Sequence, residues 1–176
     1  MDHFAYCDLL VDEIEACAVD FERADPSAAV PSCPEWTVAD LATHLGGIHR
    51  WAEALVRDRA VVRKTLRELG GSPDERPTPD DEAATWAAWL RAGGRRLIAT
   101  LREADPDAPM WAWGADQHVR FWSRRQVHET MVHRWDAALA SLGRLDASAC
   151  VADPAVAVDG VDEFLENLPI AVYFRP

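Results

Sequence analysis

A chain of 176 residues with a formal net charge of −12 is long enough for one globular domain, and its charge has the wrong sign for binding a nucleic-acid backbone or an anionic membrane surface. Hydrophobic residues make up 49% of the chain, enough for a sizeable core, yet no apolar run approaches the ~20 residues that cross a bilayer. The first residues lack a basic segment followed by an apolar one, so we expect no signal peptide and a cytoplasmic protein.

The first predicted element is a helix over residues 3–24. Its apolar side chains recur at the spacing of one helix face, at Tyr6, Leu10, Ile14, Cys17 and Phe21. The helix ends before Pro26, because the residue that precedes a proline is disfavoured in the α conformation. A loop with three prolines over residues 26–36 separates it from the next helix.

A second helix is predicted to begin after Thr37. The Thr37 hydroxyl can accept a hydrogen bond from the Asp40 amide, which is a variant of the capping box. The apolar stripe that follows, from Val38 to Val62, indicates a long helix that ends near Leu69, just before two glycines.

Two further long helices are predicted. The third covers residues 81–104 and contains Gly93 and Gly94, which close helix packing or a nearby ligand would explain, packing being the more common reason. The fourth begins with a capping box at Ser123 and runs to Leu142. Its main inward stripe is predicted to consist of His128, Met131, Val132, Trp135, Leu139 and Leu142.

A short fifth helix is predicted over residues 154–168, followed by an apolar, extended segment at 170–174. Four long amphipathic helices joined by loops predict an all-α fold, an antiparallel four-helix bundle with a short additional C-terminal helix. The four cysteines, Cys7, Cys17, Cys33 and Cys150, lack the spacing of a zinc ribbon or a redox motif, so we expect free thiols. Cys33 precedes a helix start, which can lower a thiol pKa, but a structural role is the simpler interpretation.

Three side chains form a candidate metal site. Glu129 and His133 are four residues apart and therefore lie on one face of a helix, about 6 Å apart along its axis. His44 lies on the second helix beside Leu41 and Ile48, so it points toward the bundle interior. Three protein ligands with an open position are typical of a catalytic metal site.

The spacing alone leaves a simpler alternative open. A Glu–His pair of this kind is usually solvated, and a histidine on an apolar face is usually a core residue with a hydrogen-bond partner. The pair lies away from the stripe through Trp135 and shares its face with Trp122 and Ala140, which indicates a second packed surface on this helix.

Two longer segments resemble known signatures. Residues 33–47 read CPEWTVADLATHLGG, and residues 125–136 read RQVHETMVHRWD. Both resemble signatures of the mycothiol-dependent maleylpyruvate isomerase family, whose metal-binding N-terminal domain is a four-helix bundle of the DinB-like superfamily. The resemblance extends in order and spacing over nearly the whole chain.

The resemblance implies a ligand set and a cofactor. It implies that His44, Glu129 and His133 bind a divalent metal ion, most often Zn²⁺, and that mycothiol is the co-substrate. Family members commonly continue into a smaller C-terminal domain that contributes to the substrate site. We therefore expect residues 1–176 to form a single DinB-like domain, which a C-terminal domain can complete, and to bind metal without efficient turnover of maleylpyruvate on their own.

Three more side chains are candidates for the same site. Asp136 could orient a metal ligand, although a simple pair with Arg134 or solvent is the more common role. Arg125 could meet an anionic substrate or cofactor, or be solvated in the first helical turn. Trp122, with Trp111 and Trp113, could line the mouth of a pocket or belong to the core.

The predicted function is that of a metal- and mycothiol-dependent isomerase or S-transferase, in which a metal-bound thiolate attacks an electrophilic substrate. Two alternatives stay open: a metal-binding module without catalysis, and a hydrolase that uses metal-bound water. The expected partners are a small thiol and a small electrophile, with no nucleic acid and no membrane. A C-terminal domain or a second copy of the chain could complete the substrate site.

Overall fold

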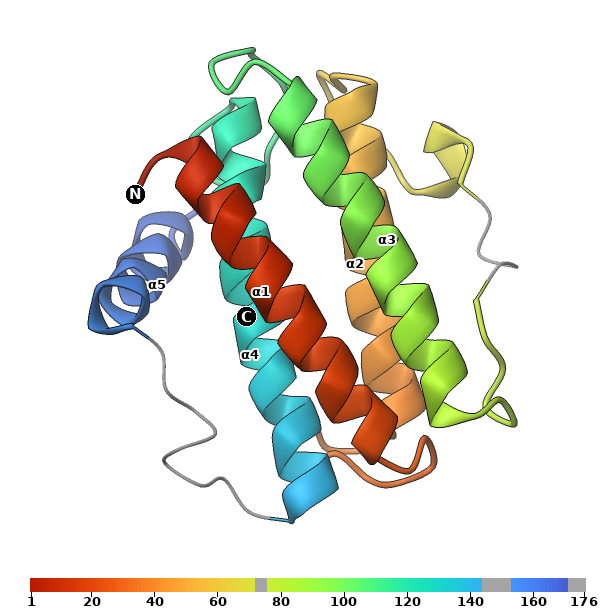
Figure 1. The fold of residues 1–176 in the computed structure, drawn as a ribbon. Coiled ribbons are helices and arrows are strands. Elements are labelled where there is room, and N and C mark those ends of the chain that lie inside the picture. The colour runs from red at the N-terminus through yellow and green to blue at the C-terminus, as the bar shows by residue number, and fades with distance from the viewer. Residues whose placement is uncertain (72–75, 144–152, 171–176) are drawn as a thin grey trace.

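The computed structural model describes residues 1–71, 76–143 and 153–170, and this part of the chain is helical, without strands. Its elements are α1 (His3–Arg23), α2 (Val38–Arg57), the short 3-10 helix η1 (Arg67–Leu69), α3 (Ala83–Glu103), α4 (Val119–Leu142) and α5 (Pro154–Asn167). Helices α1 to α4 form a bundle, and α5 lies beside α4 at its edge (Figure 1). The predicted all-α bundle with an additional C-terminal helix is therefore confirmed. No helix in the described part is both long and apolar enough to cross a membrane.

The bundle has a long crossover. Helix α1 packs on α3 and α4, and α2 packs on the same two helices from the other side. Consecutive helices α1 and α2 are antiparallel, as are α3 and α4, whereas α2 and α3 run in the same direction (Figure 1). The crossover between α2 and α3 places α2 against α4, and these are the two helices that carry the candidate metal ligands.

The capping box that was predicted at the start of α2 is present. The Thr37 hydroxyl accepts from the Asp40 amide at 3.2 Å, and the Asp40 carboxylate accepts from the Thr37 amide at 2.9 Å. The predicted end of this helix is wrong, because α2 ends at Arg57 and not near Leu69. Arg59 adopts a left-handed conformation with a φ of 43°. The Ala60 amide then donates a hydrogen bond to the Leu55 carbonyl at 3.0 Å, which closes the end of the helix.

The predicted start of α4 is also wrong. The helix begins at Val119, and Ser123 is fully buried one turn inside it, with its hydroxyl donating to the Arg120 carbonyl at 3.0 Å. The predicted stripe holds for His128 and Met131, which are buried, but Val132 and Leu142 are 49% and 53% exposed. The face of α4 that is buried in the bundle includes Val127, Thr130 and Ala137 instead, because α4 has to cover both α1 and α2.

Close packing explains the glycines within the helices. A Cβ atom on Gly46 would lie 2.0 Å from the Trp89 ring, and one on Gly94 would lie 2.6 Å from Ile14. Gly93 faces the Arg50 guanidinium in the same way. These contacts agree with the expectation that Gly93 and Gly94 serve helix packing.

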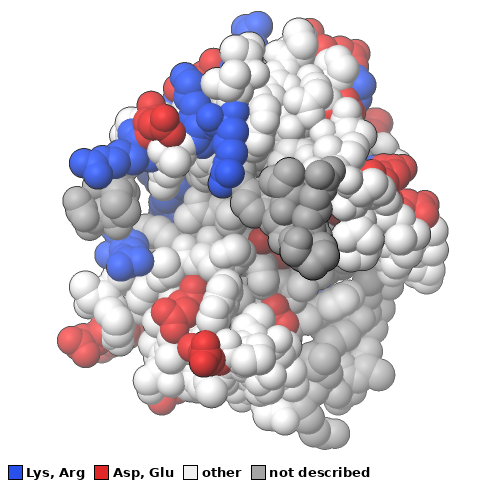
Figure 2. Space-filling model, turned by 180° about the vertical axis from the view of Figure 1, so that it is seen from behind, with Lys and Arg blue, Asp and Glu red and all other residues white. Residues whose placement is uncertain are grey.

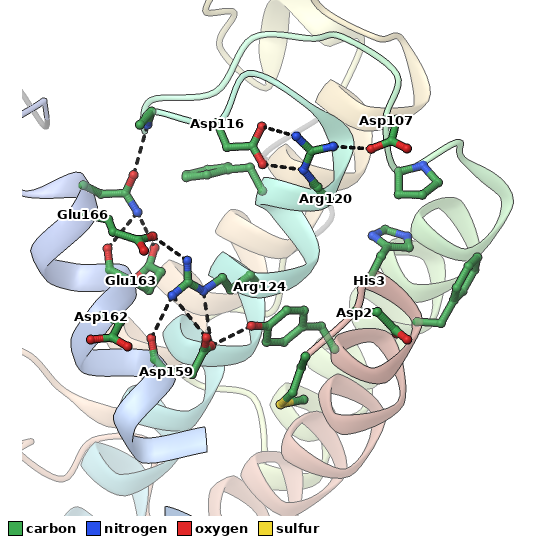
Figure 3. Close-up of a pocket in the computed structure, with 17 residues that line it drawn as sticks. Asp2, His3, Asp107, Asp116, Arg120, Arg124, Asp159, Asp162, Glu163 and Glu166 are labelled. Carbon is green, nitrogen blue, oxygen red and sulfur yellow. Dashed lines mark hydrogen bonds and ion pairs between the residues drawn. The ribbon is translucent and has the colours of Figure 1, made fainter. Parts of the chain in front are cut away.

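Helix α5 is attached to the bundle mainly by polar contacts (Figure 3). Asp159 accepts from the Tyr6 hydroxyl at 2.8 Å and from Arg124 Nε at 3.2 Å, and it lies 2.7 Å from Nε2 of His128. Arg124 also donates to Glu166 at 2.6 Å. These contacts border a polar cavity of about 850 Å³ between the starts of α1 and α4 and the helix α5.

Three of the four cysteines lie in the described part, and all three are free thiols, as expected. Cys7 and Cys17 are buried, and Cys33 is partly buried. Cys150 and the end of the apolar segment predicted at 170–174 lie outside the described residues.

Candidate metal centre

The three predicted ligands converge from two helices. His44 projects from α2, and Glu129 and His133 project from adjacent turns of α4. Oε1 of Glu129 lies 3.1 Å from Nε2 of His44 and 3.3 Å from Nε2 of His133. The rings of His44 and His133 meet edge to face, with their centroids 4.9 Å apart.

These distances fit a tetrahedral metal site. Metal–nitrogen and metal–oxygen bonds of about 2.0–2.1 Å at tetrahedral angles place ligand atoms roughly 3.3 Å apart. The ligand atoms of His44, Glu129 and His133 all lie within 4.8 Å of one another, so small side-chain movements bring them to that spacing. Two imidazoles and one carboxylate are a donor set that suits Zn²⁺.

The electrostatics of the cluster favour a cation between these side chains. Burial disfavours the Glu129 carboxylate, but hydrogen bonds with His133 and His44 hold its pKa well below the usual range of a glutamate. Burial likewise disfavours the His133 imidazolium, but hydrogen bonds to Asp136 and Glu129 raise its pKa to about 9. The site thus holds a negative charge that attracts either protons or a metal ion.

Two neighbours hold the ligands in place. Oδ2 of Asp136 lies 2.8 Å from Nδ1 of His133, the nitrogen that faces away from Glu129. Arg125 donates to the second oxygen of Glu129 and, at 3.0 Å, to Glu163 of α5. Arg134, the alternative partner considered for Asp136, forms an ion pair with Glu13 at 3.1 Å instead.

A cavity of about 460 Å³ opens beside His44 and Glu129. Its other lining residues are Ile48, Trp51, Arg63, Trp113, Trp122, Arg125 and Gln126. Trp122 forms part of the cavity wall, and it is fully buried from solvent. Its indole N–H donates to the Trp111 carbonyl at 3.2 Å. Trp111 itself is not among the lining residues, unlike Trp113.

Comparison with known families shows where this chain belongs. A family model described as the mycothiol maleylpyruvate isomerase N-terminal domain matches residues 7–138. The chain belongs to this family. The match to the mycothiol maleylpyruvate isomerase N-terminal domain includes all three candidate ligands and Asp136, and it ends before α5. Searches among curated proteins and among solved structures found no match.

The structure adds residues to the candidate site that the sequence did not predict. Trp36 packs on His44 with ring centroids 5.1 Å apart, and Trp51 and Arg63 line the cavity. Gln126 also lines it, is almost completely buried, and has no hydrogen-bond partner for its carboxamide oxygen among the described residues. Its position three residues before Glu129, on the same helix face, was the one signal in the sequence that could have identified it.

Basic side chains flank the cavity despite the acidic composition of the chain. The segment from the last residue of α2 to the first residue of η1 carries Arg57, Arg59, Arg63, Lys64 and Arg67. Lys and Arg side chains gather at the upper left of Figure 2, which is turned by 180° from Figure 1, where η1 lies at the upper right. Arg63 is the residue of this segment that lines the cavity, so it brings a positive charge to the cavity wall.

Proposed function

We propose that the chain binds one divalent metal ion, Zn²⁺ in the first place, through His44, Glu129 and His133, and that it uses mycothiol as co-substrate in an isomerase or S-transferase reaction. The observation that carries this proposal is the convergence of the three ligand atoms beside a cavity of about 460 Å³. Membership of the mycothiol maleylpyruvate isomerase N-terminal domain family supports the choice of thiol. We place the protein in the cytoplasm, where small thiols are kept reduced.

A metal ion bound here would supply Lewis acidity, which deprotonates a coordinated thiol at neutral pH. The chain's own residues orient the ligands and shape the cavity. Asp136 accepts the Nδ1 proton of His133 and so presents the Nε2 lone pair to the ion. Arg125 fixes the second oxygen of Glu129, leaving Oε1 as the ligand atom.

The cavity walls suit a thiol substrate that carries both apolar and amide groups. Trp51, Trp113 and Trp122 provide apolar surface that excludes water. The unpartnered carboxamide oxygen of Gln126 can accept a hydrogen bond from an N–H group of such a thiol. Arg125 is already bound to Glu129 and Glu163, so we propose that it contacts the cofactor only at the edge of the cavity.

The electrophile decides between the two reaction types. For an activated double bond, addition of the thiolate, rotation and elimination give cis–trans isomerisation. For a substrate with a leaving group or an epoxide, attack gives a stable thioether and hence S-transfer. The basic segment beside the cavity favours an electrophile with negative charge.

Metal content and thiol dependence test the proposal together. Protein that has never been exposed to a nickel column should contain about one zinc ion per chain, consistent with a single three-ligand site. His133→Ala should lose most of the metal, and Asp136→Asn should weaken metal affinity about 10- to 100-fold. His118→Ala is the matched control, because His118 pairs with Asp116 at the start of α4, away from the site.

Activity with maleylpyruvate and other electrophiles should then require both metal and mycothiol. Turnover of an ester or amide without any thiol would favour a hydrolase that uses metal-bound water. A metal-free native protein, unable to bind zinc, would refute the site. Full turnover by residues 1–176 would show that the bundle suffices, whereas metal binding without turnover would indicate that further groups must hold the substrate.

A further inference from the structure

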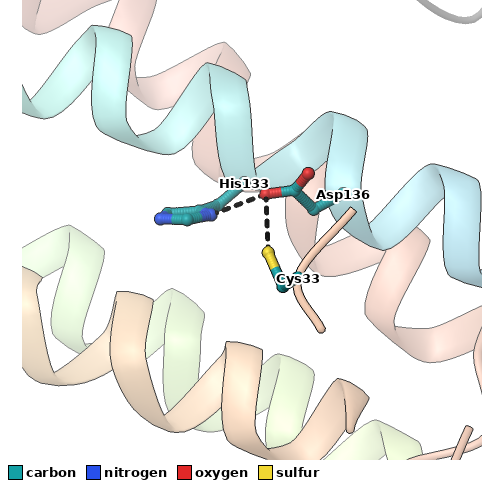
Figure 4. Close-up of side chains that lie close together, drawn as sticks. All are labelled: Cys33, His133 and Asp136. Carbon is teal, nitrogen blue, oxygen red and sulfur yellow. Dashed lines mark hydrogen bonds and ion pairs between the residues drawn. The ribbon is translucent and has the colours of Figure 1, made fainter. Parts of the chain in front are cut away.

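His133 takes part in a second cluster through its other ring nitrogen (Figure 4). Nδ1 of His133 lies 2.8 Å from Oδ2 of Asp136, and the same oxygen lies 3.6 Å from Sγ of Cys33. Potential ligand atoms of these three side chains all lie within 4.8 Å of one another. Thiol, imidazole and carboxylate are thus brought together by a loop and a helix that are about 100 residues apart in the chain.

The loop that carries Cys33 is held firmly in place. The Cys33 amide donates to the Val30 carbonyl at 3.0 Å, and the Trp36 amide donates to the Cys33 carbonyl at 3.0 Å. Glu35 completes the turn in a left-handed conformation with a φ of 70°. Since this turn positions Cys33 before any ligand binds, the cluster needs little rearrangement to accept an ion.

We propose that Cys33, Asp136 and Nδ1 of His133 form a second metal site, which takes a soft divalent ion such as Cd²⁺. A thiolate among the ligands selects soft ions over hard ones such as Mg²⁺ or Ca²⁺. Zinc bonds of about 2.3 Å to sulfur and 2.1 Å to oxygen at tetrahedral angles place two ligand atoms ~3.6 Å apart, and the longer bonds of the larger Cd²⁺ ion place them slightly farther apart. Cys33 Sγ and Asp136 Oδ2 are separated by 3.6 Å, so a small side-chain movement suffices for the larger ion.

The remaining geometry leaves room for such an ion. The side chains of His133 and Asp136 are 15% and 12% exposed, and Cys33 is partly buried, so an ion can enter and keep one position open to solvent. Ser32 donates to the other oxygen of Asp136 at 2.5 Å and would hold that carboxylate in place while Oδ2 binds the ion.

The two sites compete for one imidazole. A neutral imidazole has one protonated nitrogen and one nitrogen with a free lone pair. An ion on Nδ1 therefore leaves a proton on Nε2, which then faces Glu129 and is no longer a ligand for the first site. The structure thus assigns His133 to two mutually exclusive sites: one for Zn²⁺ with His44, and one for a soft ion with Cys33.

A cadmium titration tests this inference. Metal-free protein is titrated with CdCl₂ while the ultraviolet charge-transfer absorption of the cadmium–thiolate bond is recorded. The wild-type protein should develop this absorption with one equivalent of Cd²⁺, and Cys33→Ser should lose it. Cys150→Ser is the matched control and should retain it, and the buried Cys7 and Cys17 should not contribute.

Two further measurements separate this inference from the proposed function. His44→Ala should lose bound zinc and keep the cadmium–thiolate absorption, because His44 belongs only to the first site. Stoichiometric zinc should weaken Cd²⁺ binding about tenfold or more in the wild type, and much less in His44→Ala. The chain could fail to use mycothiol and still pass both measurements.

Three results would overturn the second site. One is a wild-type protein without the cadmium–thiolate absorption. Another is a Cys33→Ser variant that keeps the absorption while circular dichroism shows it to be folded. The third is Cd²⁺ binding that zinc does not affect in the wild type, which would rule out a shared His133.

Discussion

At the scale of single residues, the histidines near the metal centre are driven to opposite charge states by their surroundings. His133 is paired with two carboxylates, which favour its charged form. His49 lies five residues after His44 on α2 and is fully buried, and its Nε2 lies 2.8 Å from the Thr130 hydroxyl. Burial lowers the pKa of His49 to about 3.

This burial of His49 predicts a loss of stability in mild acid. The unfolded chain gains a proton at His49 near pH 6.5, whereas the folded chain does so only near pH 3. Between these values, each unit of decreasing pH should remove up to about 1.4 kcal/mol from the free energy of unfolding. His49→Gln, which stays neutral and can still bond to Thr130, should lack this contribution.

Urea unfolding at several pH values between 6.5 and 4.5, with a chelator present, measures the effect as the difference between wild type and His49→Gln. All other titrating groups are common to both proteins and cancel in that difference. Identical pH dependence in the two proteins would contradict a buried neutral His49.

At the scale of elements, the close approach of α2 and α3 depends on one of two adjacent glycines. Gly46 packs directly against the Trp89 ring, on which the Arg50 guanidinium also stacks at 3.8 Å. Gly47 has no atom within 4 Å of the position that a Cβ would take. The two residues therefore form a matched pair for substitution by alanine.

Gly46→Ala should lower the free energy of unfolding by about 1–3 kcal/mol, because the added methyl group forces Trp89 out of its position. Gly47→Ala should raise it by up to about 1 kcal/mol, since alanine is favoured over glycine in a helix and meets no neighbour here. Chemical denaturation of both variants measures these changes in the free energy of unfolding. Equal effects of the two substitutions would contradict the packing described for Gly46.

Helix α5 depends on Asp159 for its attachment. Removing this carboxylate leaves the Tyr6 hydroxyl and Nε2 of His128 without their partner. Asp159→Ala should therefore cost about 1–3 kcal/mol of stability and increase hydrogen exchange across α5. Asp162→Ala, on the exposed face of the same helix, is the control and should change neither quantity. Unchanged exchange in Asp159→Ala would show that other contacts hold α5.

At the scale of the whole molecule, folding should not require the metal. The bundle contains two apolar clusters, one around Leu10, Leu55, Leu97 and Trp122 and the other around Phe21, Leu41, Leu45 and Leu90. Because these clusters are formed by side chains other than the ligands, the packing that stabilises the helices persists when the metal is removed.

Chelation should therefore leave the helical circular dichroism and a cooperative unfolding transition intact. Zinc should add stability by mass action alone, about 2.7 kcal/mol at a free concentration 100-fold above its dissociation constant. His133→Ala should fold but not respond to zinc. If the metal-free protein loses its helical signal, the ion has a structural role and the catalytic interpretation is wrong.

The candidate site was predictable from the sequence in its ligands and in part of its surroundings. Glu129 and His133 share a helix face at a spacing of four, His44 lies on the apolar face of its own helix, and the resemblance of the two signature segments supported all three. Part of the cavity wall could not be predicted, because Arg63 lies beyond the end of α2 and its place depends on how the chain turns there. The cluster around Cys33 was missed for the same reason, since it requires a loop to meet the far turns of α4.

The sequence by itself determined which segments are helical, because apolar spacing and capping such as that of Thr37 act between residues within a few positions of each other. The tertiary structure decided where α2 ends and where α4 begins. It also decided the directions of the helices relative to one another and which side of α4 is buried. Those features depend on contacts between distant segments, such as the bond from the Trp51 indole to the Lys64 carbonyl at 2.6 Å. Local signals in the chain carry no information on such contacts, and only the packed molecule brings His44 to Glu129.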